Sequence, residues 1–174
     1  MRQSRAVFSQ AIKVLPLEYT YDQQFVDRFR QEAITAAGLH HAGVVTIHDV
    51  GQQGAWYYIV MQYVEGPTLR DLIGGRPLST LSALSIAIQV ADALAVAHAQ
   101  GIVHRDLKPA NLFLTFPSDG PPRVKILDFG IAALVHEDQP ASSGKLGTPL
   151  YMAPEQLLSG ATISGAADLY ALAL

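Results

Sequence analysis

Residues 104–111 read His-Arg-Asp-Leu-Lys-Pro-Ala-Asn, and residues 128–130 read Asp-Phe-Gly. Together they place a carboxylate, an ammonium, an amide and a second carboxylate in two short loops. Two short strands, expected over 112–115 and 123–127, join the loops through a Pro- and Gly-containing hairpin loop at 117–122. Neither His-Arg-Asp nor Asp-Phe-Gly is a specific signal alone, but the two motifs in this order are.

These four groups are the ones that transfer of a phosphoryl group to a hydroxyl requires. Asp106 is predicted to orient the acceptor hydroxyl and take its proton. Lys108 can offset charge on the transferring group. Asn111 and Asp128 offer a neutral and an anionic oxygen, a pair suited to Mg²⁺. The alternatives are a turn Asp that caps backbone amides and a solvated surface Lys.

The composition is that of a globular chain. Apolar residues make up 49% of the 174 residues and charged residues 16%. The formal net charge of -3 gives no electrostatic reason to expect nucleic acid or an anionic membrane as partner. The absence of Cys excludes a disulfide framework and a thiolate metal site. Polar residues interrupt the most apolar run, 81–99, so a buried soluble helix explains it better than a membrane span.

The hydrophobic pattern predicts an α+β fold, with strands first and helices afterwards. Alternation over 6–15 predicts a strand with Ala11 and Lys13 on one face and Ile12 on the other. The Glu-Gly-Pro break at 65–67 suggests two lobes, 1–64 and 65–174. The other expected elements are a helix from the N-cap Asp22 to Gly38, strands over 43–50 and 56–63 around a turn at 51–54, a short helix near 68–73, a long helix from Ser79 or Thr80 to Gln100, and a helix starting near Asp168.

Glu32 is expected to face the interior although it is charged. On a helix it shares an apolar stripe with Phe25 and Phe29. A carboxylate on such a stripe is costly to bury unless it is paired. Lys13 lies on the inward face of its strand, so the two are predicted to pair with each other. The alternative is two unrelated side chains whose charged ends reach solvent.

The order His-Arg-Asp…Asn, then Asp-Phe-Gly, resembles the catalytic and metal loops of the protein kinase superfamily. The style of the motifs, with Lys-Pro-Ala-Asn and Tyr-Met-Ala-Pro-Glu-Gln, is similar to bacterial Hanks-type serine/threonine kinases. The resemblance implies a two-lobed fold, a small β-rich N-lobe with one helix and a mostly helical C-lobe. It also implies ATP and Mg²⁺ as cofactors and protein substrates with Ser or Thr acceptors.

The same resemblance assigns roles to individual residues. The catalytic residues would be Asp106, Lys108, Asn111 and Asp128, and the last two would be the metal ligands. Lys108 favours Ser/Thr specificity, because tyrosine-directed relatives usually carry another residue type there. The structural residues would be His104, Arg105, Phe129, Gly130 and Asp168. Of these, His104 is expected to be a packed, hydrogen-bonded core residue, and Asp168 to brace the catalytic loop through backbone amides.

Two stretches resemble the nucleotide-binding parts of the family. Residues 10–15 resemble its Val-Ala-Ile-Lys strand, which makes Lys13 and Glu32 the pair that positions the α- and β-phosphates. Residues 59–66 resemble the hinge between the lobes. The implied adenine contacts are Met61 as gatekeeper, backbone groups of Gln62 and Val64, and Ala11 and Phe113 as apolar plates.

Residues 131–155 resemble the activation segment, ending in Ala-Pro-Glu. Thr148 is expected to face the catalytic loop and help present a Ser/Thr substrate. Phosphorylation of Ser142 or Ser143 would order the segment against Arg105. An ordinary solvated Ser pair is an equal alternative.

The sequence departs from the family pattern at both ends. A Gly-rich loop normally precedes the lysine strand, yet only twelve residues precede Lys13 and residues 1–7 contain no glycine. The chain stops inside the helix expected near Asp168, before the Arg that usually pairs with the equivalent of Glu155. We therefore expect weak or absent activity from the isolated chain, because positioning and charge shielding do most of the work in this chemistry.

Two other functions stay open. A non-catalytic, pseudokinase-like interaction module is favoured by the missing Gly-rich loop, and retention of the catalytic residues argues against it. A small-molecule kinase of similar fold is disfavoured by the Ala-Pro-Glu ending. The expected location is cytoplasmic, although the parent protein can be anchored to a membrane outside this segment. The resemblance also allows dimerisation for trans-autophosphorylation.

Overall fold

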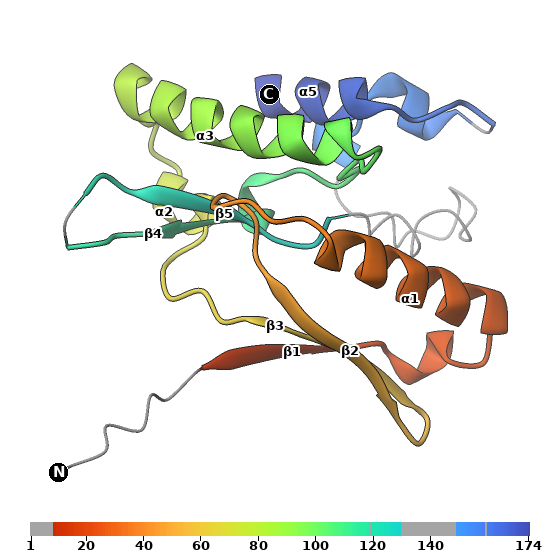
Figure 1. Ribbon diagram of the computed structural model, residues 1–174. Coiled ribbons are helices and arrows are strands. Elements are labelled where there is room, and N and C mark those ends of the chain that lie inside the picture. The colour runs from red at the N-terminus through yellow and green to blue at the C-terminus, as the bar shows by residue number, and fades with distance from the viewer. Residues whose placement is uncertain (1–8, 119, 130–148, 159) are drawn as a thin grey trace, which may run out of the picture.

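The computed structural model describes residues 9–118, 120–129, 149–158 and 160–174. The chain forms two lobes, which confirms the expected α+β architecture (Figure 1). A three-stranded sheet and helix α1 form the smaller lobe. A two-stranded hairpin and helices α2, α3 and α5 form the larger lobe, and the hairpin lies between α3 and the smaller lobe.

The sheet of the smaller lobe is antiparallel, with strand order β1-β3-β2. Its strands are β1 (Gln10–Val14), β2 (Ile47–Gln53) and β3 (Trp56–Gln62). As predicted, Ala11 and Lys13 are half-buried on one face of β1, whereas Ile12 is 63% exposed on the other. The part of the predicted strand before Ser9 lies outside the described residues.

The prediction of a strand over 43–50 followed by a turn at 51–54 is wrong in its bounds, because β2 covers Ile47–Gln53. Gly43 and Val45 are instead hydrogen-bonded to Ile126 of the other lobe, and the chain enters β2 only at Ile47. At the far end β2 continues to Gln53. Gly51 is a strand residue paired with Tyr58, and a glycine fits there because a Cβ atom would come within 2.5 Å of the Tyr58 ring.

Helix α1 (Gln23–Ala37) packs its apolar stripe on this sheet. It begins as predicted, with the Asp22 carboxylate accepting hydrogen bonds from the amides of Gln24 (2.9 Å) and Phe25 (3.3 Å). The buried helix residues Phe25 and Phe29 contribute to the core of the smaller lobe. The other buried members of this cluster are Leu15, Val26, Ala33, Val45, Ile59, Met61 and Val64.

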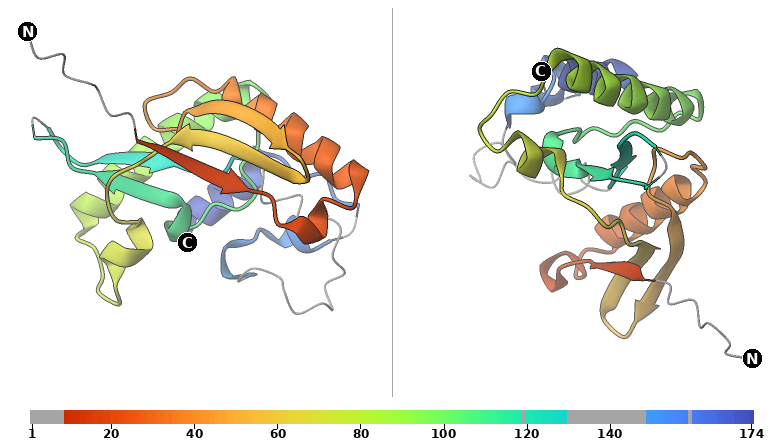
Figure 2. Two further views of the ribbon diagram at one scale, coloured as in Figure 1. Left: turned by 90° about the horizontal axis from the view of Figure 1, so that it is seen from below. Right: turned by 90° about the vertical axis from the view of Figure 1, so that its left-hand side faces the viewer.

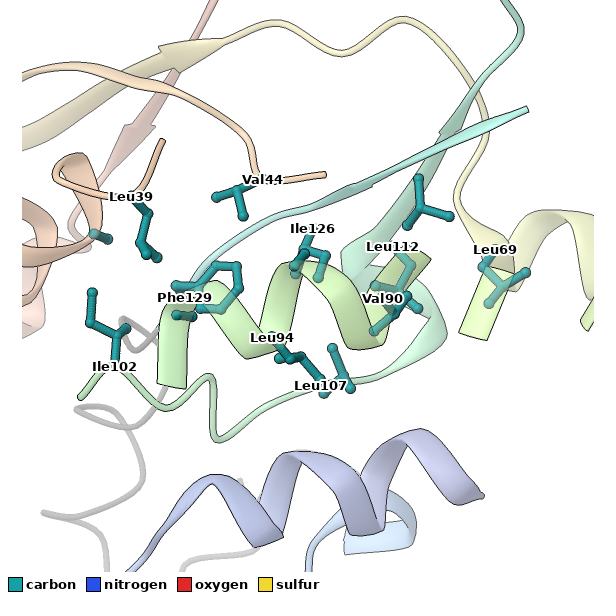
Figure 3. Close-up of a cluster of buried hydrophobic side chains, with 14 of the residues drawn as sticks. Leu39, Val44, Leu69, Val90, Leu94, Ile102, Leu107, Leu112, Ile126 and Phe129 are labelled. Carbon is teal, nitrogen blue, oxygen red and sulfur yellow. The ribbon is translucent and has the colours of Figure 1, made fainter. Parts of the chain in front are cut away.

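The larger lobe is built on the hairpin of β4 (Leu112–Thr115) and β5 (Arg123–Ile126). Around it lie α2 (Leu69–Ile73), α3 (Thr80–Ala99) and α5 (Gly165–Ala173), of which α3 packs against both β5 and α5. Figure 3 shows the apolar core between α3 and the hairpin, which includes Val90, Leu94 and Ile126. In the part of the chain that the structure describes, short 3₁₀ helices cover Leu17–Tyr19 in the smaller lobe and Pro109–Asn111, Pro149–Tyr151 and Pro154–Leu157 in the larger one.

The long apolar helix α3 follows its predicted bounds. The Ser79 hydroxyl caps its first turn by accepting from the amide of Ser82 at 3.1 Å, and Gly101, with φ 75°, follows its end. By length and composition alone α3 is the one helix among the described residues that could cross a membrane. Helix α5 begins earlier than expected, at Gly165 after the N-cap Ser164, so that Asp168 lies in its first turn.

Two backbone segments in the described ranges join the lobes (Figure 2). The first is the connector, residues 63–68, where the amide of Leu114 donates to the carbonyl of Pro67 at 2.9 Å. Gly66 is required there, because a Cβ atom would overlap the carbonyl oxygen of Leu114. The second is the loop of residues 41–45, which pairs with β5 and also reaches α3 through His41 and Asp92, 3.2 Å apart (Nε2–Oδ2).

Candidate active site

Asp106 is the centre of a small hydrogen-bonded group in the loop between α3 and β4. Its carboxylate lies 2.8 Å (Oδ2) and 3.0 Å (Oδ1) from the Lys108 ammonium. The Asn111 amide donates to the main-chain oxygen of Asp106 at 2.9 Å and to its carboxylate at 3.2 Å. Because the Asp106 side chain is only 16% exposed, these contacts hold the carboxylate in one position while leaving it open on one side.

The carboxylate of Asp168 holds the backbone of the same loop in place. Its carboxylate is 1% exposed and accepts hydrogen bonds from the amides of His104 and Arg105, both at 2.8 Å. This is the contact that the family resemblance implies. The His98 ring on α3 is a third partner, with Nε2 2.8 Å from Oδ2 of Asp168. A buried carboxylate in α5 therefore fixes the start of the catalytic loop to two helices.

His104 is a fully buried ring that also accepts and donates hydrogen bonds. The Asp106 amide donates to Nδ1 at 3.3 Å, so Nε2 carries the ring proton and donates to the carbonyl of Leu127 at 2.8 Å. The ring packs against Phe129 with centroids 4.8 Å apart. Burial lowers the pKa of His104, against the opposing effects of Asp168 and the Leu127 hydrogen bond. His104 is thus an uncharged residue whose hydrogen bonds connect the catalytic loop to the segment before Asp-Phe-Gly.

The burial of His104 leads to a pH-dependent stability. Because its pKa is lowered in the folded state, the unfolded chain binds the proton first when the pH falls below about 6.5, the ordinary His value. His104 should therefore destabilise the fold progressively below pH 6.5, by at most about 1.4 kcal/mol per pH unit, and have no such effect above it. Urea unfolding between pH 5 and 8 measures this slope.

The matched variants are His104→Phe and His40→Phe. The first keeps a ring against Phe129 and removes the titrating group, so its stability below pH 6.5 should fall less steeply than that of the wild type. His40 is exposed, and its replacement should leave the slope unchanged. Equal slopes for wild type and His104→Phe would show that another group is responsible.

Two residues next to the reacting groups have a left-handed backbone. Arg105 has φ 65° and Asp128 has φ 62°, a conformation that costs non-glycine residues energy. Arg105 is held in it from both sides, because its amide donates to Asp168 and its carbonyl accepts from Nε2 of Gln156 at 2.7 Å. The surrounding contacts therefore maintain the strained backbone of Arg105 in the catalytic loop.

The Lys13 ammonium forms an ion pair with Asp128, with Nζ 2.9 Å from Oδ2. Lys13 was predicted to pair with Glu32, but in the structure its partner is Asp128. Lys13 lies on the inward face of β1, which brings it within reach of the Asp-Phe-Gly loop. Glu32 lies on α1 with Oε2 buried. The ion pair therefore connects the two lobes and joins the strand lysine to the second carboxylate.

Asn111 and Asp128 lie on adjacent segments. The Leu127 amide donates to the carbonyl of Asn111 at 3.0 Å, which brings the start of the Asp-Phe-Gly loop against the end of the catalytic loop. No group of three His, Cys, Asp or Glu side chains suited to a metal occurs in the described part of the chain. One amide oxygen and one carboxylate nevertheless fit Mg²⁺, which usually completes its shell with water and substrate phosphate oxygens.

The residues predicted to contact adenine come together in one apolar cluster. Met61 and Val64 are buried members of the smaller-lobe core, and Ala11 and Phe113 pack against it from opposite lobes. Leu127 packs against the same cluster. The sequence analysis did not single out Leu127, although its place directly before Asp128 could have indicated it. Gln62 ends β3 at the start of the connector, and its amide donates to the carbonyl of Thr46 at 2.8 Å.

Several predicted site residues cannot be placed. Gly130, Ser142, Ser143 and Thr148 lie outside the described residues. Glu155 is described, in the 3₁₀ helix Pro154–Leu157, and forms no ion pair with any residue in the described ranges.

Sequence reasoning missed two positioning residues. Gln156 accepts from the amide of Ala153 at 3.0 Å and donates to the Arg105 carbonyl, so it ties the Ala-Pro-Glu turn to the catalytic loop. His98 appeared only as a polar interruption of an apolar helix, but it is the side-chain partner of Asp168. Gly165 leaves room for this ring, because a Cβ atom there would lie 2.5 Å from Nδ1 of His98.

Comparisons with known proteins agree with this geometry. The family model described as protein kinase domain matches residues 2–174. The serine/threonine-protein kinase Pkn1 of Myxococcus xanthus is 43% identical over 164 residues, which are 93% of this chain and 23% of that protein. The serine/threonine-protein kinase PrkC of Bacillus subtilis is 42% identical over 166 residues, 94% of this chain and 25% of that protein.

Solved structures give the same result. The crystal structure of the Mycobacterium tuberculosis PknI kinase domain superposes with a TM-score of 0.74 at 39% identity, covering 95% of this chain and 60% of that one. The chain thus spans about a quarter of the length of the two named relatives and less than two thirds of the solved domain. Sequence, fold and site geometry all lead to one conclusion: this chain belongs to the protein kinase domain family, together with bacterial serine/threonine kinases.

Proposed function

We propose that this chain contributes the centre of a kinase that transfers the γ-phosphoryl group of ATP to Ser or Thr hydroxyls of proteins. The observation that carries the proposal is the hydrogen-bonded group of Asp106, Lys108 and Asn111, which lies beside the ion pair of Lys13 and Asp128. This reaction needs a general base, a cation beside the transferring group, a lysine that binds phosphates and a carboxylate that binds a metal.

Asp106 is the base in this proposal. Its carboxylate would accept the proton of the acceptor hydroxyl while the hydroxyl oxygen forms a bond to the γ-phosphorus. The bond from the γ-phosphorus to the bridging oxygen breaks in the same reaction, and ADP leaves with that electron pair. Lys108, held against Asp106, can offset the negative charge on the transferring oxygens. Asn111 keeps the Asp106 carboxylate oriented.

The ion pair of Lys13 and Asp128 supports a role in binding Mg-ATP. The Lys13 ammonium would form ion pairs with phosphate oxygens, and the Asp128 carboxylate would bind a metal ion. Each partner thus neutralises the other, with exposed fractions of 38% and 24% that leave both accessible. Mg²⁺, when bound, would be held by Asn111 and Asp128 and would reduce the repulsion between phosphate groups. The apolar plates Ala11 and Phe113 would receive the adenine ring.

A thermal-shift titration of the 174-residue chain with Mg-ATP tests the binding part of this proposal. Mg-ATP should raise the melting temperature, since a ligand at 100 times its Kd stabilises the fold by about 2.7 kcal/mol. Lys13→Met should weaken binding by about tenfold or more, because a charged contact to phosphate contributes about 1.5–3 kcal/mol. Asp128→Asn should remove the difference between ATP with and without Mg²⁺.

Arg30→Met is the matched control, because Arg30 is an exposed cation on the outer surface of α1. It should bind Mg-ATP like the wild type. A wild-type chain that is folded but not stabilised by Mg-ATP would contradict the proposal and favour the non-catalytic interaction module.

A further inference from the structure

A cleft of about 680 Å³ lies next to the connector, and the proposed mechanism does not use it. It is formed by Ser9 and Gln10 of the β1 end, Thr46 and His48 of the β2 start, Gln62, Tyr63 and Glu65 around the connector, and Lys125 of β5. Both lobes contribute to its wall, and its volume is in the range of small-molecule sites, which are frequent at such junctions.

On the sheet of the smaller lobe, two residues of this cleft are on the opposite face from Ala11, one of the adenine plates. Gln10 and Gln62 are cross-strand partners, and Ala11 and Met61 are the next pair in the same register. Because side chains alternate across a strand, the two glutamines point to the opposite face from Ala11 and Met61. On the hairpin, Lys125 is the cross-strand partner of Phe113, the other plate, so the titrations below also test whether the cleft and the nucleotide site bind separately.

Lys125 is the unusual member of the cleft wall. It lies between the buried Val124 and Ile126 on β5, and its ammonium donates to the carbonyl of Val44 at 3.2 Å. Within the described ranges no carboxylate lies within ion-pair distance of it. Burial lowers the pKa of Lys125, the expected result for an ammonium moved out of water without a counter-charge. An ammonium has three donors, so two remain beyond the bond to Val44.

We propose that the cleft binds a small oxyanion, the phosphate or carboxylate group of a ligand, with Lys125 as its charge partner. The hydroxyls of Ser9, Thr46 and Tyr63 are neutral donors for the same group. Glu65 is the opposing charge in the wall. It is exposed at the connector, where solvent screens it, so it orients the anionic end of a ligand toward Lys125 without preventing binding.

Isothermal titrations of the 174-residue chain with inorganic phosphate, and separately with acetate, at constant ionic strength test this proposal. At least one of the two anions should bind saturably at one site. Lys125→Gln should weaken that binding by about tenfold or more, since a hydrogen bond to a charged group contributes about 1.5–3 kcal/mol. The anion that binds more tightly identifies the ligand class, phosphate or carboxylate.

Arg123→Gln is the matched control, because it removes one cation from the same strand at an exposed position. It should bind the anion like the wild type. Lys125→Arg keeps the charge and should retain most of the affinity, which separates a lost ligand contact from a damaged fold if Lys125→Gln is unstable. Circular dichroism checks the fold of each variant.

Three outcomes would overturn the proposal. In the first, neither anion binds, and in the second, Arg123→Gln loses as much affinity as Lys125→Gln. The third concerns Lys13. A third titration with Lys13→Met separates the cleft from the nucleotide site. This variant should keep its anion affinity, and if it loses that affinity instead, the anion binds in the nucleotide pocket and the proposed cleft site is wrong. The result does not depend on kinase activity, so the proposed function can fail or hold independently.

Discussion

Replacing Asp168 by Ala is expected to lower the free energy of unfolding by about 3–5 kcal/mol, the cost of breaking a buried, hydrogen-bonded charge network. The substitution leaves the amides of His104 and Arg105 inside the protein without their acceptor, and it removes the partner of His98. It also releases the strained backbone at Arg105. Urea denaturation followed by circular dichroism measures the loss.

Asp92→Ala is a close control for this prediction. Asp92 also lies near a histidine, with Oδ2 3.2 Å from Nε2 of His41, but its side chain is 73% exposed. Exposed pairs of this kind contribute about 0–1 kcal/mol, so this variant should remain close to wild type in stability. A similar loss for both variants would mean that the burial of Asp168 does not determine its contribution.

Replacing Asp106 by Asn should reduce phosphoryl transfer by about 10²–10⁴-fold, the range that a positioned general base provides. Asn has the same shape and can still accept a hydrogen bond from Lys108, but it cannot take the hydroxyl proton. Transfer of labelled γ-phosphate to a serine-containing protein acceptor measures the effect. Because the wild-type chain is expected to be slow, the ratio is taken at protein concentrations and reaction times at which wild-type transfer is measurable.

Binding measurements separate this effect from a loss of nucleotide affinity. Asp106→Asn should bind Mg-ATP as the wild type does, because Asp106 contacts Lys108 and Asn111 and takes no part in the ion pair of Lys13 and Asp128. If the variant transferred phosphate at the wild-type rate, Asp106 would not be the base, and the proposed mechanism would fail.

The local features of this fold were predictable from sequence because their causes are local. The N-cap Asp22 and the amphipathic stripe of α1 lie within one helix, and the alternation of Ala11 and Ile12 lies within one strand. The catalytic loop was equally predictable, since Lys108 and Asn111 both lie within five residues of Asp106 and donate hydrogen bonds to it.

The features that were missed depend on segments far apart in the chain. Strand β2 starts late because Gly43 and Val45 pair with Ile126, about eighty residues away, and no local pattern contains that information. The partner of Lys13 is likewise set by the packing of one lobe on the other. Gly51 was predicted to lie in a turn because glycine is common in turns, and the need for a glycine in this strand comes from the Tyr58 ring on the neighbouring strand.

The two junctions between the lobes also protect the hairpin of the larger lobe. A strand pair standing alone has two open edges, and open edges recruit strands from other chains. Here residues 67–68 pair along the outer side of β4, and residues 43–45 pair along the outer side of β5. The same hydrogen bonds that hold the lobes together thus close both edges, so pulling the lobes apart would expose two sites for aggregation at once.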